Sequence, residues 1–261
     1  MAAESNIVWL GTTASLLAGA ATGLGAAGVA FIRTLSERAE DMLLSAAAGI
    51  MLAAAFFSLL LPGLEYGREL IPNESLAVLV VILGLLLGAA TLFWIHRHAP
   101  HEHFILGHEG PDLPKLRRIW LFIIAITLHN FPEGMAVGVG FAGGNIENGR
   151  SLAIGIGLQN IPEGLAVAAS MMAINYSRWQ AFGVGFLTGL VEPVGGLFGS
   201  TLVWLAEPLM PVTLGFAAGA MLFIISDEII PETHRGAYKT VATFALLIGF
   251  VVMMFLDATL G

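Results

Sequence analysis

The sequence predicts an all-α polytopic membrane protein, with eight transmembrane helices arranged as an inverted repeat and both termini extracytoplasmic. The first observation is composition: of 261 residues, 57% are hydrophobic and 11% charged, and the mean hydropathy is +0.84. Soluble domains carry about 25% charged residues. The 32 glycines are typical of helices that approach closely in lipid. The absence of cysteine excludes disulfides and thiolate metal ligands.

The second observation is a series of eight apolar runs, each near the roughly 20 residues that cross a hydrocarbon core. The first run has no basic leader before it, so we interpret it as a retained helix rather than a cleaved signal peptide. The runs divide the chain into helices 1–3 (1–95), a His-rich loop (96–118), helices 4–5 (119–174) and helices 6–8 (175–261). The runs are residues 7–32, 42–61, 76–95, 119–141, 152–174, 181–205, 212–230 and 241–260.

The distribution of basic residues predicts the orientation of these helices. The connections after runs one, three, five and seven hold nine Lys and Arg residues, and the other side holds two, Arg68 and Arg150. Cytoplasmic loops carry the excess of positive charge, so the first side is predicted to be cytoplasmic. The nine are Arg33, Arg38, Arg97, Lys115, Arg117, Arg118, Arg178, Arg235 and Lys239.

The third observation is internal similarity. AAGIML beginning at Ala47 in run two is echoed by AAGAML beginning at Ala217 in run seven, and AGAATGL from Ala18 more weakly by VGFLTGL from Val184. Runs four and five share NxPEG. Helices 1–3 would then correspond to helices 6–8 in the opposite direction, which is the plan of secondary transporters with a site near the midplane.

Two polar clusters lie in the middle of runs four and five, in LHNFPEG and LQNIPEG. Residues three and four apart share one face of a helix, so each cluster presents its side chains together. A proline in each is expected to kink the helix and free a carbonyl, and Glu192 before Pro193 repeats the arrangement in run six. The two clusters are His129, Asn130 and Glu133, and Gln159, Asn160 and Glu163.

These side chains together predict a metal site. An uncompensated charge at the bilayer centre costs at least about 2.5–3.5 kcal/mol, and no Lys or Arg lies inside any run to pair with the three glutamates. Structural kinks or a single helix–helix contact would explain one cluster but not three carboxylates. Carboxylate, imidazole and amide groups suit zinc, iron, manganese or cadmium rather than copper(I).

The segments HNFPEG, LQNIPEG, GLVEPVGG and SDEIIPETH resemble the ZIP family of divalent-metal transporters, in particular its bacterial GufA-like branch. The resemblance covers nearly the whole chain and implies two bundles, helices 1, 4, 5 and 6 against 2, 3, 7 and 8. It also implies a role for Met51 at the first metal position, and for Asp227 and Glu228 at the mouth of the pathway. The implied transport site is His129, Asn130, Glu133, Gln159, Asn160, Glu163 and Glu192.

One position departs from the family pattern. Many family members carry Asp where this chain has Asn160, and the change removes a negative charge. Two divalent ions would bring four positive charges against three carboxylates. We therefore expect one dominant ion, with a second, bridged ion bound more weakly.

The loop HRHAPHEHFILGHEGPDLPKLRR is rich in histidine, which is commonly metal-binding by composition. A receiving or sensing role for imported metal and a plain solvated loop are both open interpretations. Glu232 and His234, at the predicted cytoplasmic end of run seven, are candidates to assist exit. The loop histidines are His96, His98, His101, His103 and His108.

Three function classes follow from these residues. The leading one is a transporter in a bacterial cytoplasmic membrane that moves zinc or another divalent cation inward by an elevator-type or rocking motion. An intramembrane metalloenzyme is disfavoured because HNFPE lacks the second His of an HExxH helix. A non-transporting metal sensor is the third. The expected partners are metal ions and the lipid bilayer, with no nucleic acid, and a homodimer is left open.

Overall fold

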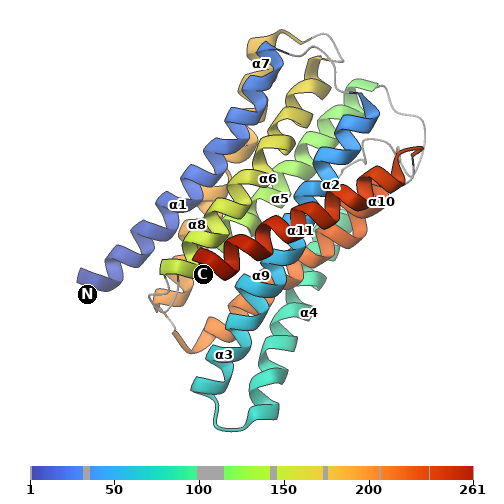
Figure 1. Cartoon of the computed structure of the whole chain (residues 1–261). Coiled ribbons are helices and arrows are strands. Elements are labelled where there is room, and N and C mark those ends of the chain that lie inside the picture. Colours follow the sequence, from blue (N-terminus) through green and yellow to red (C-terminus); the bar gives the residue numbers. More distant parts are fainter. Residues whose placement is uncertain are drawn as a thin grey trace.

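The computed structural model describes residues 2–31, 36–98, 115–141, 146–172, 176–205, 207–234 and 236–260, and these residues form helices and short turns without any strand. Figure 1 shows the long helices running side by side. The helices are α1 (Ala2–Ala27), α2 (Glu37–Ala53), α3 (Leu61–Leu70), α4 (Glu74–His98), α5 (Lys115–Gly140), α6 (Ile146–Met172), α7 (Arg178–Gly189), α8 (Glu192–Leu205), α9 (Met210–Ile224), α10 (Ile230–Thr233) and α11 (Lys239–Leu260).

The chain is a multi-pass helical membrane protein. Within the described residues, seven helical stretches are long and apolar enough to cross a bilayer. They correspond to predicted runs one, two, three, five, six, seven and eight, whereas α5, which covers run four, is not among them. The count of eight spans therefore stays a prediction.

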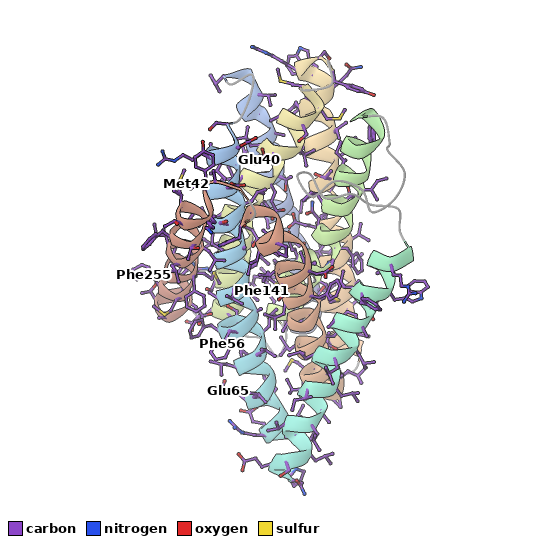
Figure 2. The ribbon with its side chains drawn as sticks, turned by 90° about the vertical axis from the view of Figure 1, so that its right-hand side faces the viewer. Glu40, Met42, Phe56, Glu65, Phe141 and Phe255 are labelled. Atoms are coloured by element: carbon purple, nitrogen blue, oxygen red, sulfur yellow. The ribbon has the colours of Figure 1, made fainter. Side chains whose placement is uncertain are left out.

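The second run lies in a longer helical rod than predicted. α2 continues through the π-helix η2 (Ala54–Leu60) into α3, so the rod spans residues 37–70 rather than 42–61. Hydropathy marks the part of a helix inside lipid, and the charged residues at both ends extend the rod beyond it. Figure 2 shows Glu40, Phe56 and Glu65 in that order along the rod. A second π-helix, η5 (Ile225–Ile229), follows α9. Such segments frequently occur at functional sites.

The three proline motifs have two different outcomes. α5 and α6 continue as helices through Pro132 and Pro162. The sixth run is instead divided, because α7 ends at Gly189 and α8 begins at Glu192. Pro193 then lies in the first turn of α8, where a missing backbone N–H costs no intrahelical hydrogen bond. The expected kink at Glu192 is therefore a break between two helices.

The helices pack in two groups. The first group is α1, α5, α6, α7 and α8, which contact one another extensively, and the second is α2, α3, α4, α9 and α11. The groups meet where α6 contacts α2 and α11, and where α5 contacts α9. This is the division that the family resemblance implies.

Glycines allow close backbone approaches inside each group. A Cβ at Gly134 of α5 would collide with the carbonyl of Glu192 in α8, and one at Gly164 of α6 would collide with the carbonyl of Thr22 in α1. In the second group, a Cβ at Gly49 would collide with the carbonyl of Leu246, and a Cβ at Gly219 would collide with the carbonyl of Leu85. Helices in lipid associate through such small residues.

Several of the glycines in these close approaches are separated by 170 positions in the sequence. Gly49 and Gly219 make equivalent contacts, and Gly19 and Gly189 each meet the other's backbone carbonyl. The weak match that placed Ala18 opposite Val184 differs from this spacing by four residues, which is about one helical turn. The inverted repeat itself stays a prediction.

Candidate metal site

The polar clusters of the sequence meet in the interior of the first group. α5 provides Glu133, α6 provides Gln159, Asn160 and Glu163, and α8 provides Glu192 in its first turn. Glu163 is 4% exposed, and the other four are fully buried. The PEG repeats therefore place their carboxylates together, with Glu192 beside them.

Two amides of α6 hold two of the carboxylates. Gln159 Nε2 donates a hydrogen bond to Glu133 Oε1 at 2.7 Å, and Asn160 Nδ2 donates to Glu192 Oε1 at 2.7 Å. α6 is thus linked to α5 on one side and to α8 on the other. Gln159 and Asn160 can reach different helices because consecutive residues on a helix point in different directions.

The three glutamates interact electrostatically. Glu133 experiences the charges of Glu163 and Glu192, and Glu192 experiences that of Glu163. Like charges that are removed from water repel strongly, because the low dielectric constant of the interior screens them little. A divalent cation would relieve this repulsion.

The site also contains buried oxygen atoms that have no hydrogen-bond partner among the described residues. Buried polar groups in proteins almost always have one, so these atoms need an explanation. Carboxylate and amide oxygens are suitable ligands for hard and borderline divalent cations, and the donor set therefore fits such an ion. The unpartnered atoms are Asn130 Oδ1, Glu133 Oε2, Gln159 Oε1, Asn160 Oδ1 and Glu192 Oε2.

The carboxylates alone do not form a ligand cage. Among the side chains that the structure describes, no group of three or more His, Asp or Glu residues is placed to hold a metal ion. A metal ion bound in this arrangement would therefore take amide oxygens as well as carboxylate oxygens.

The two asparagines have equivalent supports. Asn130 Nδ2 donates to the carbonyl of Thr188 at 2.8 Å, and Asn160 Nδ2 donates to the carbonyl of Ala18 at 2.8 Å. Thr188 and Ala18 are again 170 positions apart. Sequence analysis missed both partners, because a backbone carbonyl leaves no signal in residue identity.

Two hydroxyl residues of α1 were also missed. Ser15 Oγ donates to the carbonyl of Glu192 at 2.7 Å and so helps to fix the start of α8. Thr22, 170 positions before Glu192, has a buried Oγ1 that no described residue contacts with a hydrogen bond. Their only signal was the occurrence of Ser and Thr in an apolar run.

The structure gives the remaining predicted residues other neighbours or does not describe their side chains. Met51 is buried in the apolar cluster that also contains Met135 and Ile156. Asp227 is exposed on η5. His234 contacts the carbonyl of Ile230 and Thr243 Oγ1 through its two ring nitrogens, at 3.1 and 3.2 Å. The described residues exclude His101, His103 and His108 and the side chains of His96, His98, His129, Glu228 and Glu232.

Known proteins share this sequence along nearly its whole length. The family model described as ZIP Zinc transporter matches residues 95–257. Zinc transporter GufA of Myxococcus xanthus is 47% identical over 251 residues, which cover 96% of this chain and 99% of the relative. Zinc transporter ZIPB of Bordetella bronchiseptica is 45% identical over 93% of this chain and 78% of its own. Zinc transporter ZIP11 of Homo sapiens is 36% identical over a stretch that covers 92% of this chain and 94% of the relative.

Proposed function

The chain belongs to the ZIP family of zinc transporters, in its bacterial GufA-like branch, and on that premise we propose that it carries zinc into the cytoplasm through the site between α5, α6 and α8. It is a membrane transporter of divalent cations and not an enzyme. Iron, manganese and cadmium are further proposed substrates because the same oxygen ligands accept them. The proposed location is a bacterial cytoplasmic membrane.

One observation carries the proposal: three mutually repelling glutamates are buried beside amide oxygens that have no partner among the described residues. Hydrogen bonds satisfy one oxygen each of Glu133 and Glu192, and no described group is a partner for the other oxygen. A cation is the simplest partner for such a set, because it compensates the charge and accepts several oxygens at once.

The amides also suit a site that must release its ion. Without metal, Gln159 and Asn160 donate to the carboxylates and lower the cost of burying their charge. A cation that enters must compete with these hydrogen bonds, which moderates its affinity. Transport requires binding that is strong enough to admit the ion and weak enough to let it leave.

We further propose an inverted repeat of eight spans with both termini outside, in which the first group moves against the second by an elevator-type or rocking motion. The 170-residue relation between close backbone approaches supports the repeat. Gly134–Glu192 and Gly164–Thr22 join helices within the first group, and Gly49–Leu246 within the second. Such close backbone contacts between helices favour motion of each group as a rigid body.

The interface between the groups has different contacts. Gly155 of α6 faces the flexible side chain of Met253 in α11. Met51 of α2 and Met253 are both buried in the apolar cluster to which the two groups contribute residues. Methionine side chains adapt their shape readily, so the two groups can slide at this interface while the close backbone contacts within each group stay intact.

The test is zinc uptake by cells that lack other zinc importers, compared with uptake by sealed proteoliposomes that contain a zinc-sensitive dye. We expect the wild-type chain to accumulate zinc in both systems and the Glu133→Gln variant to do so in neither. Zinc binding by the purified protein without flux into either compartment would contradict the proposal and favour a metal sensor.

A further inference from the structure

An open apolar groove lies between α1 and α6 of the first group. Its volume is about 430 Å³, and it is bounded by Leu17 and Ala21 of α1 and by Gly157 and Leu158 of α6. This volume falls within the range of small-molecule sites, about 300–1,000 Å³. Leu17 and Leu158 are 73% and 42% exposed, so the groove opens sideways to the surroundings of the helices.

The groove has one charged end. Arg150, near the start of α6, is the only charged residue among the described residues that line it. The side chain is exposed and forms no ion pair with any described residue, Glu147 one turn away included. Arg68, by contrast, lies 3.4 Å from Glu74 Oε1. Arg150 is thus a cation at the mouth of an apolar groove, and it pairs with no acidic side chain in the described part of the chain.

The length of the groove matches one leaflet. From Arg150 to Ile161, a helix rises by about 16 Å at 1.5 Å per residue. Half of a bilayer hydrocarbon core is about 15 Å thick. With the guanidinium at headgroup level, a chain that follows α6 would therefore reach Ile161, close to the bilayer centre.

We propose that this groove binds one anionic phospholipid, with its phosphate at Arg150 and one acyl chain along α6 as far as Ile161. The charge at one end and the apolar walls match the two parts of such a lipid, and α1 and α6 are both candidate spans that lie in lipid. The groove also adjoins the metal site, because Ala18 lines it while its carbonyl accepts a hydrogen bond from Asn160.

The test uses the purified full-length protein, stripped of lipid by detergent and then mixed with phosphatidylglycerol or with phosphatidylcholine of the same acyl chains. Bound lipid is counted by native mass spectrometry. We expect one molecule per chain and a preference for phosphatidylglycerol of about fivefold, the factor that one basic residue contributes at an anionic membrane surface.

Three variants separate the two parts of the proposal. Arg150→Gln should abolish the preference, while Arg68→Gln, which removes an equal charge from the same predicted side, should keep it. Gly157→Leu should reduce binding of both lipids by filling the groove. The site tolerates a side chain there, since a Cβ at Gly157 meets Ala18 and Ala21 only at ordinary distances of 3.7 and 3.9 Å.

Several outcomes would overturn the proposal. They are equal binding of the two lipids by the wild-type chain, an unchanged preference in Arg150→Gln, or unchanged binding in a folded Gly157→Leu protein. A dimer mass that disappears in both groove variants would show instead that a second copy of the chain occupies the groove. If Gly157→Leu fails to fold, Arg150→Gln alone decides the result.

Discussion

The side-chain nitrogen of Asn160 donates to Glu192 Oε1 at 2.7 Å and to the carbonyl of Ala18 at 2.8 Å. One amide therefore joins three helices, α6, α8 and α1. An aspartate at this position has no N–H and cannot make either bond. The residue that departs from the family pattern is thus a donor that stabilises the metal-free site.

The Asn160→Asp variant should be less stable without metal and bind metal more strongly. The new carboxylate would repel Glu192 and lose two hydrogen bonds, so we expect the metal-free protein to lose on the order of 1–3 kcal/mol of unfolding free energy. Zinc should restore this loss and reach a higher occupancy than in the wild type. Thermal unfolding and metal analysis of the purified protein would measure both effects.

Asn130→Asp is the matched comparison for that variant. Asn130 donates to the carbonyl of Thr188 and to no described carboxylate. It should lose stability without metal to a smaller extent, because no partner carboxylate is repelled. Identical zinc titrations for wild type and Asn160→Asp would contradict the prediction.

Removing the charge of Glu133 or Glu163 should stop transport without unfolding the protein. Glu133→Gln keeps an oxygen that can accept the hydrogen bond from Gln159 Nε2, so the fold should persist. Uptake of zinc should fall by at least about tenfold, as expected when a metal-binding group is altered. Glu163→Gln should behave alike, and Glu147→Gln on the exposed side of the same helix should not.

A side chain at Gly134 should force α5 and α8 apart. The added Cβ of Gly134→Ala would collide with the carbonyl of Glu192, and overpacking of this kind typically costs about 1–3 kcal/mol. Chemical denaturation in detergent should show this loss, together with reduced zinc uptake. Gly183→Ala is the control, since nothing lies within 4 Å of its Cβ. Equal stability of the two variants would argue against a close backbone contact between α5 and α8.

The loop histidines should be dispensable for the transport step. Replacing all five with Ser should preserve most zinc uptake, because the loop is predicted to lie at the cytoplasmic surface, away from the midplane site. The feedback of internal zinc on the rate should change instead. Uptake by cells at rising internal zinc would measure this, and near-complete loss of uptake at normal membrane abundance would favour an obligatory relay. The five are His96, His98, His101, His103 and His108.

Sequence patterns predicted the fold better than the details of the site. Apolar runs mark helices because lipid demands internal backbone hydrogen bonding. Glu133 and Glu163 of the two PEG segments lie close enough to interact electrostatically. The role of these residues as ligands stays a proposal. The π-helices could not be predicted, because i to i+5 hydrogen bonding at Ala54 or Ile225 has no distinct composition. The carbonyl partners of the asparagines left no side-chain signal either.

The order of helices in the two groups has a consequence for biosynthesis. α1 pairs with α6, and α2 pairs with α11, the last long helix of the described chain. The helices that are synthesised first therefore keep glycine faces open in the bilayer until distant partners are inserted. Neither group can assemble as a continuous segment of the nascent chain. Gly49, whose added Cβ would collide with the carbonyl of Leu246, keeps an uncovered surface until α11 is inserted.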